Sequence, residues 1–222
     1  MATPKVVTEL LQRSNRLGSE PRFTNYAGGN TSAKGSIPNP ATGQETTVLW
    51  VKGSGGDLGT LTESGLAALD LEKFKALKNV YRGIDHEDEM VALFDYCRFG
   101  IGGAAPSIDT TMHGLVPFDH VDHLHPDSII ALATSVDGEK LTRECFGDEI
   151  LWVDWRRPGF QLGLDMERIA SENPTAKGCI LGGHGLTTWG ATSKECEERS
   201  IDRKSTRLNS SHVSESRMPS SA

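Results

Sequence analysis

Two histidines one residue apart, His123 and His125 in VDHLHPDSII, have the side chains and spacing of a metal-ligand pair. In an extended strand, side chains two residues apart point to the same face, so both imidazoles can aim at one point. Catalytic zinc commonly takes three protein ligands and keeps a fourth position open. His184, which lies between glycines in LGGHGL, is the candidate third ligand, because glycine lets a backbone turn approach another element closely. The ordinary alternative is a pair of polar residues on a surface strand.

Two glycine-rich loops have the composition of anion-binding segments. GGNTS (residues 28–32) and KGSGG (residues 52–56) combine exposed backbone N–H groups with hydroxyl or amide side chains. Neither loop is a nucleotide fingerprint, because GxxxxGK[ST] is absent and Leu58 stands where GxGxxG needs its third glycine. Taken singly, a loop of this kind is more often a plain turn.

Asp109, in PSIDTTMH, is the candidate for proton transfer. A carboxylate near a metal-bound substrate can move a proton to or from carbon or oxygen. The structural alternative is a helix cap, which Ser107 or Thr110 would provide equally well.

In this order and at this spacing, five segments resemble the class II aldolase/adducin family: NYAGGNTSAK, LWVKGSGGDLGT, PSIDTTMHGLVPF, HVDHLHPD and LGGHGLTTWG. The resemblance covers about residues 14–200 and is greatest to the aldolase domain of bifunctional rhamnulose-1-phosphate aldolase/short-chain dehydrogenase proteins. It implies a single α/β domain with a central, mainly antiparallel sheet flanked by helices. It also implies a homotetramer, with active sites between subunits.

The resemblance also implies roles for individual residues. His123, His125 and His184 match the family's Zn²⁺ ligands. The substrate phosphate would be bound at positions that match the family's loops, namely Gly29, Asn30, Ser54, Gly55 and Ser107. Asp109 stands where most class II sugar-phosphate aldolases have a catalytic glutamate, so its carboxylate is one methylene shorter.

The activity that the resemblance implies is aldol cleavage of a ketose 1-phosphate. We expect L-rhamnulose 1-phosphate to give dihydroxyacetone phosphate and L-lactaldehyde, as in rhamnose metabolism. One alternative on the same scaffold is dehydration, as in methylthioribulose-1-phosphate dehydratases. A non-enzymatic, adducin-like interaction module is disfavoured, because such relatives lack the zinc histidines.

Alternating strands and helices are needed to position these residues. Apolar spacing predicts a helix that ends at Gly18, and β-branched and aromatic content predicts a strand over residues 46–52. Residues 25–36 are predicted to form a loop, and Thr60 with Glu63 to cap a helix that continues through Leu77. A helix is expected over residues 86–100, and Pro126 favours a helix start after the His123 strand.

Three further elements are predicted towards the end of the chain. Residues 150–155 and 178–185 are expected to form strands, the second ending in a tight turn, and residues 165–172 a helix. Thr192 and Glu195 are expected to cap a last helix. The irregular alternation of helices and strands indicates mixed α/β structure.

The composition of the 222 residues excludes several classes of protein. A formal net charge of -7 argues against a general binder of nucleic acid or of membrane surfaces. Four widely spaced cysteines without a CxxC pair favour reduced thiols in a cytoplasmic protein over a disulfide framework. Small anionic substrates remain compatible with this charge, since a local loop can bind them.

The last segment differs from the rest of the chain. Residues 202–222 contain seven serines and no apolar periodicity, which predicts a non-native or disordered tail. Residues 1–201 are therefore expected to form a class II aldolase domain that is truncated at its carboxyl end. We also expect the dehydrogenase domain of the bifunctional relatives to be missing from this chain.

Overall fold

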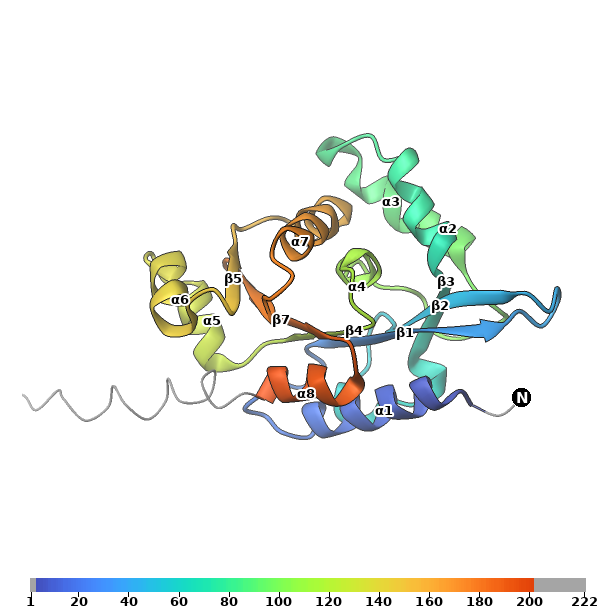
Figure 1. Cartoon of the computed structure of the whole chain (residues 1–222), viewed down its shortest axis with the longest axis horizontal. Coiled ribbons are helices and arrows are strands. Elements are labelled where there is room, and N and C mark those ends of the chain that lie inside the picture. Colours follow the sequence, from blue (N-terminus) through green and yellow to red (C-terminus); the bar gives the residue numbers. More distant parts are fainter. Residues whose placement is uncertain (1–2, 202–222) are drawn as a thin grey trace, which may run out of the picture.

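Seven strands form a sheet through the middle of the molecule (Figure 1). The computed structural model describes residues 3–201, so the predicted tail at 202–222 lies outside the described residues. The sheet order is β3-β2-β1-β4-β7-β6-β5. The strands are β1 (Asn30–Pro38), β2 (Glu45–Lys52), β3 (Leu66–Asp70), β4 (His120–Leu124), β5 (Ile150–Val153), β6 (Gly178–Leu181) and β7 (Gly185–Gly190).

Strand direction brings several strand ends together. Every neighbouring pair is antiparallel except β5 and β6, which run parallel. The predicted α/β fold with a mainly antiparallel sheet is therefore confirmed. It follows that the carboxyl ends of β2, β4, β5 and β6 lie beside the amino ends of β1, β3 and β7. We call this the carboxyl end of the sheet.

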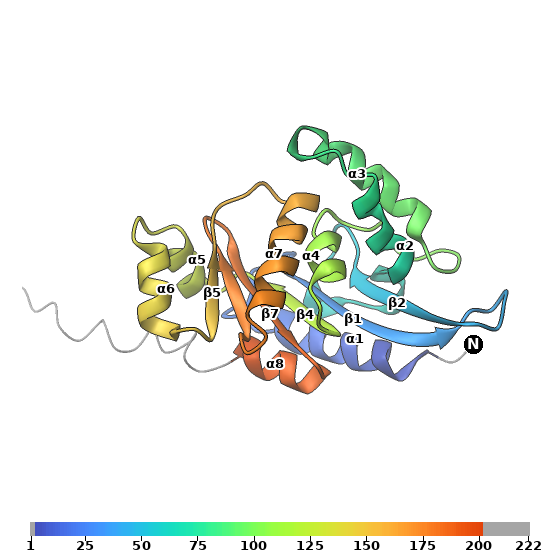
Figure 2. The ribbon, with the colours of Figure 1, turned by 45° about the horizontal axis from the view of Figure 1, so that its top comes forward.

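Helices cover both faces of the sheet (Figures 1 and 2). α1 and α8 lie side by side on one face, whereas α2, α4 and α7 lie on the other, and α5 and α6 pack near β5. The helices are α1 (Lys5–Gly18), α2 (Leu71–Ala76), α3 (Glu87–Leu93), α4 (Thr110–Leu115), α5 (Asp127–Ala133), α6 (Gly138–Phe146), α7 (Phe160–Glu172) and α8 (Ser193–Ile201). Short 3-10 helices span Leu58–Thr60, Glu63–Gly65, Leu77–Asn79, Ile84–His86 and Phe94–Cys97.

A buried ion pair joins α1, β4 and α8. Arg13 Nε donates to Asp122 Oδ1 over 2.9 Å, and both side chains are fully buried. The same guanidinium donates to the carbonyl of Ser32 and to the hydroxyl of Ser193, while Ser200 donates to the other carboxylate oxygen. Burying two charges costs several kcal/mol each unless their hydrogen bonds are satisfied, as they are here. The pair thereby fixes the strand that carries His123.

Several predicted elements are confirmed. The helix that ends at Gly18 is α1, and the strand predicted over residues 46–52 is β2. The strand at His123 is β4, and Pro126 immediately precedes α5. At the last helix, Thr192 Oγ1 accepts from the N–H of Glu195, whose carboxylate accepts from the N–H of Ala191. Thr192 therefore caps the helix as predicted, but Glu195 reaches back to the residue before the cap and not to the N–H of Thr192 that a capping box uses.

The prediction of a loop over residues 25–36 is wrong from Asn30 onward, because Asn30–Pro38 forms strand β1. This segment has few residues with high β-propensity. It pairs with β2 on one side and β4 on the other, so cross-strand pairing outweighs local composition. Gly35 also lies against Val6 of α1, where a Cβ would come within 3.2 Å of Cγ1.

The predicted helix from Thr60 is also wrong in its first half. Leu66–Asp70 forms β3, and the helix begins only at Leu71. Asp70 is its cap, since the carboxylate accepts from the N–H groups of Glu72 and Lys73 at 3.1 Å each. The helix predicted over residues 86–100 is shorter, because α3 ends at Leu93 and a 3-10 turn follows.

Among the described residues, no helix is long and apolar enough to cross a membrane.

Candidate metal centre and anion-binding loops

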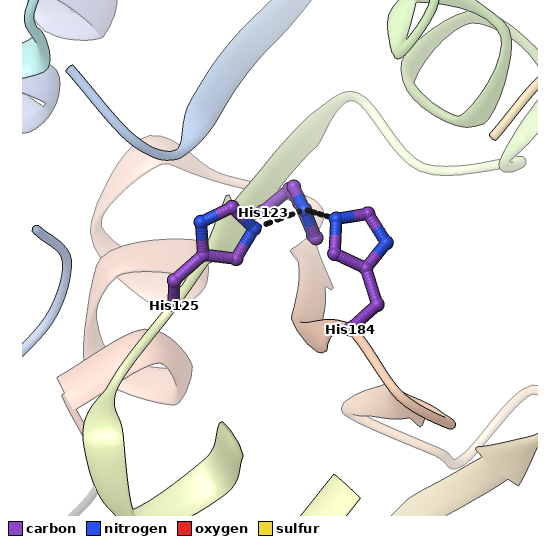
Figure 3. Close-up of side chains that lie close together, drawn as sticks. All are labelled: His123, His125 and His184. Atoms are coloured by element: carbon purple, nitrogen blue, oxygen red, sulfur yellow. Dashed lines mark hydrogen bonds between the residues drawn. The ribbon is translucent and has the colours of Figure 1, made fainter. Parts of the chain in front are cut away.

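Three histidines meet at the carboxyl end of the sheet (Figure 3). His123 is the last residue but one of β4, His125 directly follows the strand, and His184 lies in the turn between β6 and β7. The Nε2 atom of His123 lies 2.9 Å from Nε2 of His125 and 3.3 Å from Nε2 of His184. In a tetrahedral site with Zn–N bonds of about 2.0–2.1 Å, neighbouring nitrogens are roughly 3.3 Å apart. The predicted trio is therefore brought together at a spacing that fits one zinc ion.

Hydrogen bonds orient the central imidazole. His123 Nδ1 lies 3.0 Å from the carbonyl of Leu186 and 3.1 Å from the hydroxyl of Thr187. Because a carbonyl only accepts, Nδ1 donates to it, which leaves the Nε2 lone pair free to face the other two histidines. Metal-binding histidines almost always have such a partner on the second nitrogen.

Glycine at position 185 makes room for the cluster. A Cβ there would lie 2.7 Å from His125 Cδ2 and 2.7 Å from the carbonyl of Leu124. Contacts this short require the backbone or the ring to move. The glycine after His184 is thus needed so that β7 can pass close to His125.

The histidines are held in the neutral form that binds metal. Burial lowers the pKa of His123 well below its ordinary value and that of His125 to about 4, and it also lowers the pKa of His184. Within residues 3–201, His123, His125 and His184 form the group of potential metal ligands whose ligand atoms lie close enough together to hold one ion. The donor set, three neutral imidazole nitrogens, is one that zinc accepts.

Asp109 lies at the start of α4 but does not cap it. Its backbone takes the N-cap position, yet within the described residues its side chain makes no capping hydrogen bond. Burial raises the pKa of Asp109, while the nearby His184, Asn30 and Lys52 side chains oppose that shift. The capping alternative is therefore not supported, and the carboxyl group is close enough to interact with both the histidine cluster and the glycine loops.

Three loops that include the predicted phosphate-binding residues contact one another. Asn30 pairs with His123 across β1 and β4, and its Nδ2 donates to Ser107 Oγ over 3.2 Å. The N–H of Ser54 donates to the carbonyl of Ala105 over 2.9 Å. The buried Oδ1 of Asn30 has no hydrogen-bond partner among the described residues, which leaves an acceptor facing this junction.

Backbone geometry leaves donors free in the second loop. Gly55 and Gly56 both have a φ of +75°, a backbone conformation that residues with a side chain rarely adopt. Their N–H groups donate to no backbone carbonyl of the described residues. In the first loop, Gly29 has a φ of +74° and packs against Leu58, which lies in the 3-10 turn that follows the second loop. Free N–H groups in a concave loop are the usual means of binding an oxyanion.

Lys52 is a residue of this site that sequence reasoning missed. Only 4% of its surface is exposed, and its ammonium forms no hydrogen bond or ion pair with another described residue. Burial lowers the pKa of Lys52, and the charges of Asp109 and Asp57 oppose that effect. The sequence did offer a signal for Lys52, which is its position at the start of KGSGG. It places a positive charge beside the three contacting loops.

Comparison with protein families gives one match over most of the chain. The model of the "Class II Aldolase and Adducin N-terminal domain" matches residues 9–202. Among curated proteins, the "Uncharacterized oxidoreductase YuxG" of Bacillus subtilis is 37% identical over 198 residues, which are 89% of this chain and 28% of that protein. The chain therefore spans little more than a quarter of that relative's length.

Solved structures share the fold. The N-terminal class II aldolase domain of a conserved protein from Thermoplasma acidophilum has a TM-score of 0.81 and 27% identity, with 94% of each chain covered. A sugar-phosphate aldolase from Thermotoga maritima has a TM-score of 0.70 and 14% identity, with 97% of each chain covered. At 14% identity the second match supports the fold alone.

Proposed function

Because this chain belongs to the class II aldolase and adducin N-terminal domain family, we propose that it is a zinc-dependent aldolase acting on a ketose 1-phosphate. The substrate that we propose is L-rhamnulose 1-phosphate, with dihydroxyacetone phosphate and L-lactaldehyde as products. The observation that carries the proposal is that the ligand nitrogens of three neutral histidines converge on one point, beside loops whose free backbone N–H groups can bind an anion. Both features lie at the same end of the sheet.

The loops would fix the substrate through its phosphate. Gly29, Asn30, Ser54, Gly55 and Ser107 are the predicted contacts, and Lys52 would add a cation to them. Binding energy from a group remote from the reacting bond can hold that bond in a reactive position. The phosphate would thus place the C3–C4 bond between the histidine cluster and Asp109.

Asp109 would move the proton that the cleavage requires. When the C3–C4 bond breaks, C4 becomes the aldehyde carbon as its hydroxyl loses a proton, and C3 retains the bonding electrons and accepts a proton. Asp109 would deliver the proton to C3, and in the synthetic direction it would remove it. Zinc held by His123, His125 and His184 would supply Lewis-acid stabilisation of the negative charge that develops on the C2–C3 fragment.

The decisive measurement combines metal content with product analysis. We expect the purified chain to contain about one zinc per subunit and to release dihydroxyacetone phosphate from L-rhamnulose 1-phosphate, detected with a coupled reductase. His184→Ala should lose both properties. His86→Ala is the matched control, because His86 lies on the surface and pairs with Glu89.

Other results of the zinc and product measurements would point to a different function. Loss of water from the sugar phosphate without dihydroxyacetone phosphate would identify a dehydratase. Absence of zinc, or equal zinc in the parent and His184→Ala, would refute the metal assignment. The homotetramer and the separate dehydrogenase domain remain predictions of the family resemblance, and the cytoplasmic location remains a prediction from the cysteines.

A further inference from the structure

Trp155 lies at the turn that carries His184. β5 and β6 run parallel with Val153 opposite Leu181, so Trp155 and Gly183 each lie two residues beyond the paired ends. A Cβ on Gly183 would lie 2.9 Å from Trp155 Cδ1, and one on Gly182 would lie 3.1 Å from the Trp155 backbone nitrogen. The indole therefore rests directly on the glycine turn that precedes His184.

Although Trp155 is held at this turn, most of its side chain is accessible. It is 70% exposed, whereas Trp50 is 7% exposed and Trp189 is fully buried. The charged neighbours of Trp155 are paired with other groups. Asp154 accepts from the indole of Trp152, and Arg156 and Arg157 form ion pairs with acidic residues on α7 and α3. Within this short loop, the exposed indole face remains open to a ligand.

The sheet order gives that exposed face a position relative to the rest of the site. Across the carboxyl end, the anion-binding loops lie at β2 and β1, the histidines at β4 and at the β6–β7 turn, and Trp155 at β5. Neighbouring strands are about 4.8 Å apart. Trp155 therefore lies on the side of the histidine cluster away from the phosphate-binding loops, one strand beyond the turn of His184.

From this row of groups we infer that Trp155 contacts the end of the substrate farthest from the phosphate and favours an apolar group there. The inference rests on the proposed function, because it takes the phosphate to lie at the glycine loops. A ketose phosphate bound in that direction extends its aldehyde-forming half past His184. An indole face offers apolar contact to a terminal methyl group and none of the hydrogen bonds that a terminal hydroxyl requires.

This arrangement separates the roles of the two halves of the substrate. Dihydroxyacetone phosphate would occupy the loops and the histidine cluster without reaching Trp155. The aldehyde would lie against the indole. Trp155 would therefore determine selectivity among aldehydes while leaving the binding of dihydroxyacetone phosphate unaffected.

The test uses the full chain and Trp155→Ala in the synthetic direction. With dihydroxyacetone phosphate saturating, we expect the variant to lose about 10-fold in kcat/KM for L-lactaldehyde and less than about 2-fold for glycolaldehyde, which lacks the methyl group. The KM for dihydroxyacetone phosphate should not change. Trp155→Phe should recover most of the preference, because it restores an apolar ring.

Tyr96→Ala is the matched control, since Tyr96 is an 80% exposed aromatic residue in the turn after α3. It should leave the preference for L-lactaldehyde unchanged. If the ratio of kcat/KM for the two aldehydes is unchanged in Trp155→Ala, the inference is overturned while the aldolase activity stays established.

A binding measurement makes the inference testable without turnover. By calorimetry with the metal-loaded protein in an Asp109→Ala background, where we expect cleavage to be blocked, Trp155→Ala should weaken binding of L-rhamnulose 1-phosphate about 10-fold and leave that of dihydroxyacetone phosphate unchanged. Equal effects on both phosphates would refute the inference. If the parent bound neither phosphate, the proposed function would fail and this inference with it.

Discussion

Replacing Asp109 by alanine should separate proton transfer from metal binding. Asp109 occupies the N-cap position of α4 without making a capping hydrogen bond. Loss of a working cap typically costs about 1 kcal/mol, but here there is no such bond to lose. We therefore expect the free energy of unfolding to change by less than about 0.5 kcal/mol. The three histidines do not depend on Asp109 for orientation, so zinc content should stay at the parental level.

The expected effect on turnover is much larger. Removal of a positioned acid or base typically reduces the rate by about 10²- to 10⁴-fold, which corresponds to roughly 2.7–5.4 kcal/mol in the activation free energy. The KM should change little, because Asp109 is not among the groups proposed to hold the phosphate. Asp109→Asn should lose turnover to the same extent, since an amide keeps the shape but cannot transfer the proton.

The assay is release of dihydroxyacetone phosphate from L-rhamnulose 1-phosphate, alongside metal analysis and urea unfolding of the same preparations. Asp137→Ala is the matched control, because Asp137 is also an N-cap aspartate without a capping hydrogen bond, at the start of α6. Turnover by Asp109→Ala within about 3-fold of the parent would refute its role in proton transfer. Loss of zinc from the variant would show instead that Asp109 supports the metal centre.

Three further substitutions test Lys52 at the phosphate site, Arg13 in the buried ion pair, and His113, a fully buried histidine of α4. Lys52→Met should raise the KM for the sugar phosphate about 10-fold or more, with kcat nearly unchanged, because a charge-assisted hydrogen bond contributes about 1.5–3 kcal/mol; an unchanged KM in steady-state kinetics would remove Lys52 from the site. Arg13→Met should lower the free energy of unfolding by about 3–5 kcal/mol in urea titrations, because it leaves the buried Asp122 charge unpaired, and a loss under 1 kcal/mol would contradict this. Burial lowers the pKa of His113 to about 3, so between about pH 6.5 and 3 the unfolded chain binds a proton that the folded chain does not, and stability falls as the pH falls. His113→Gln should reduce this pH dependence by about one proton, so parallel stability curves for parent and variant would exclude the effect.

Local patterns in the sequence predicted much of the candidate site. The alternation of His123 and His125 and the proline that ends their strand are properties of adjacent residues, so they could be interpreted without tertiary structure. The glycines around His184 likewise indicated a tight turn. The same local reasoning failed for residues 30–36, where small polar residues suggested a loop and the structure has a strand between two others.

Lys52 and Trp155 show what local patterns do not contain. Lys52 is near Asp109 because the loop after β2 is hydrogen-bonded to the segment that leads into α4, from the N–H of Ser54 to the carbonyl of Ala105. Trp155 lies on Gly183 because β5 and β6 run parallel. Neither neighbour is close in the sequence. Asp109 shows the same limit in another way, since the sequence left capping and proton transfer open, and only the absence of a capping bond among the described residues argued against the first.

The sequence by itself determined which residue types are available for metal and anion chemistry, and it indicated many, but not all, of the short helices, strands and turns. These depend on backbone preferences and on the period of neighbouring side chains. Only the tertiary structure decided that His184, 59 residues after His125, completes the cluster, and that the glycine loops, the histidines and Trp155 lie in one row. The order and direction of strands determine that row, and they are fixed by pairing and packing between segments that are distant in the chain.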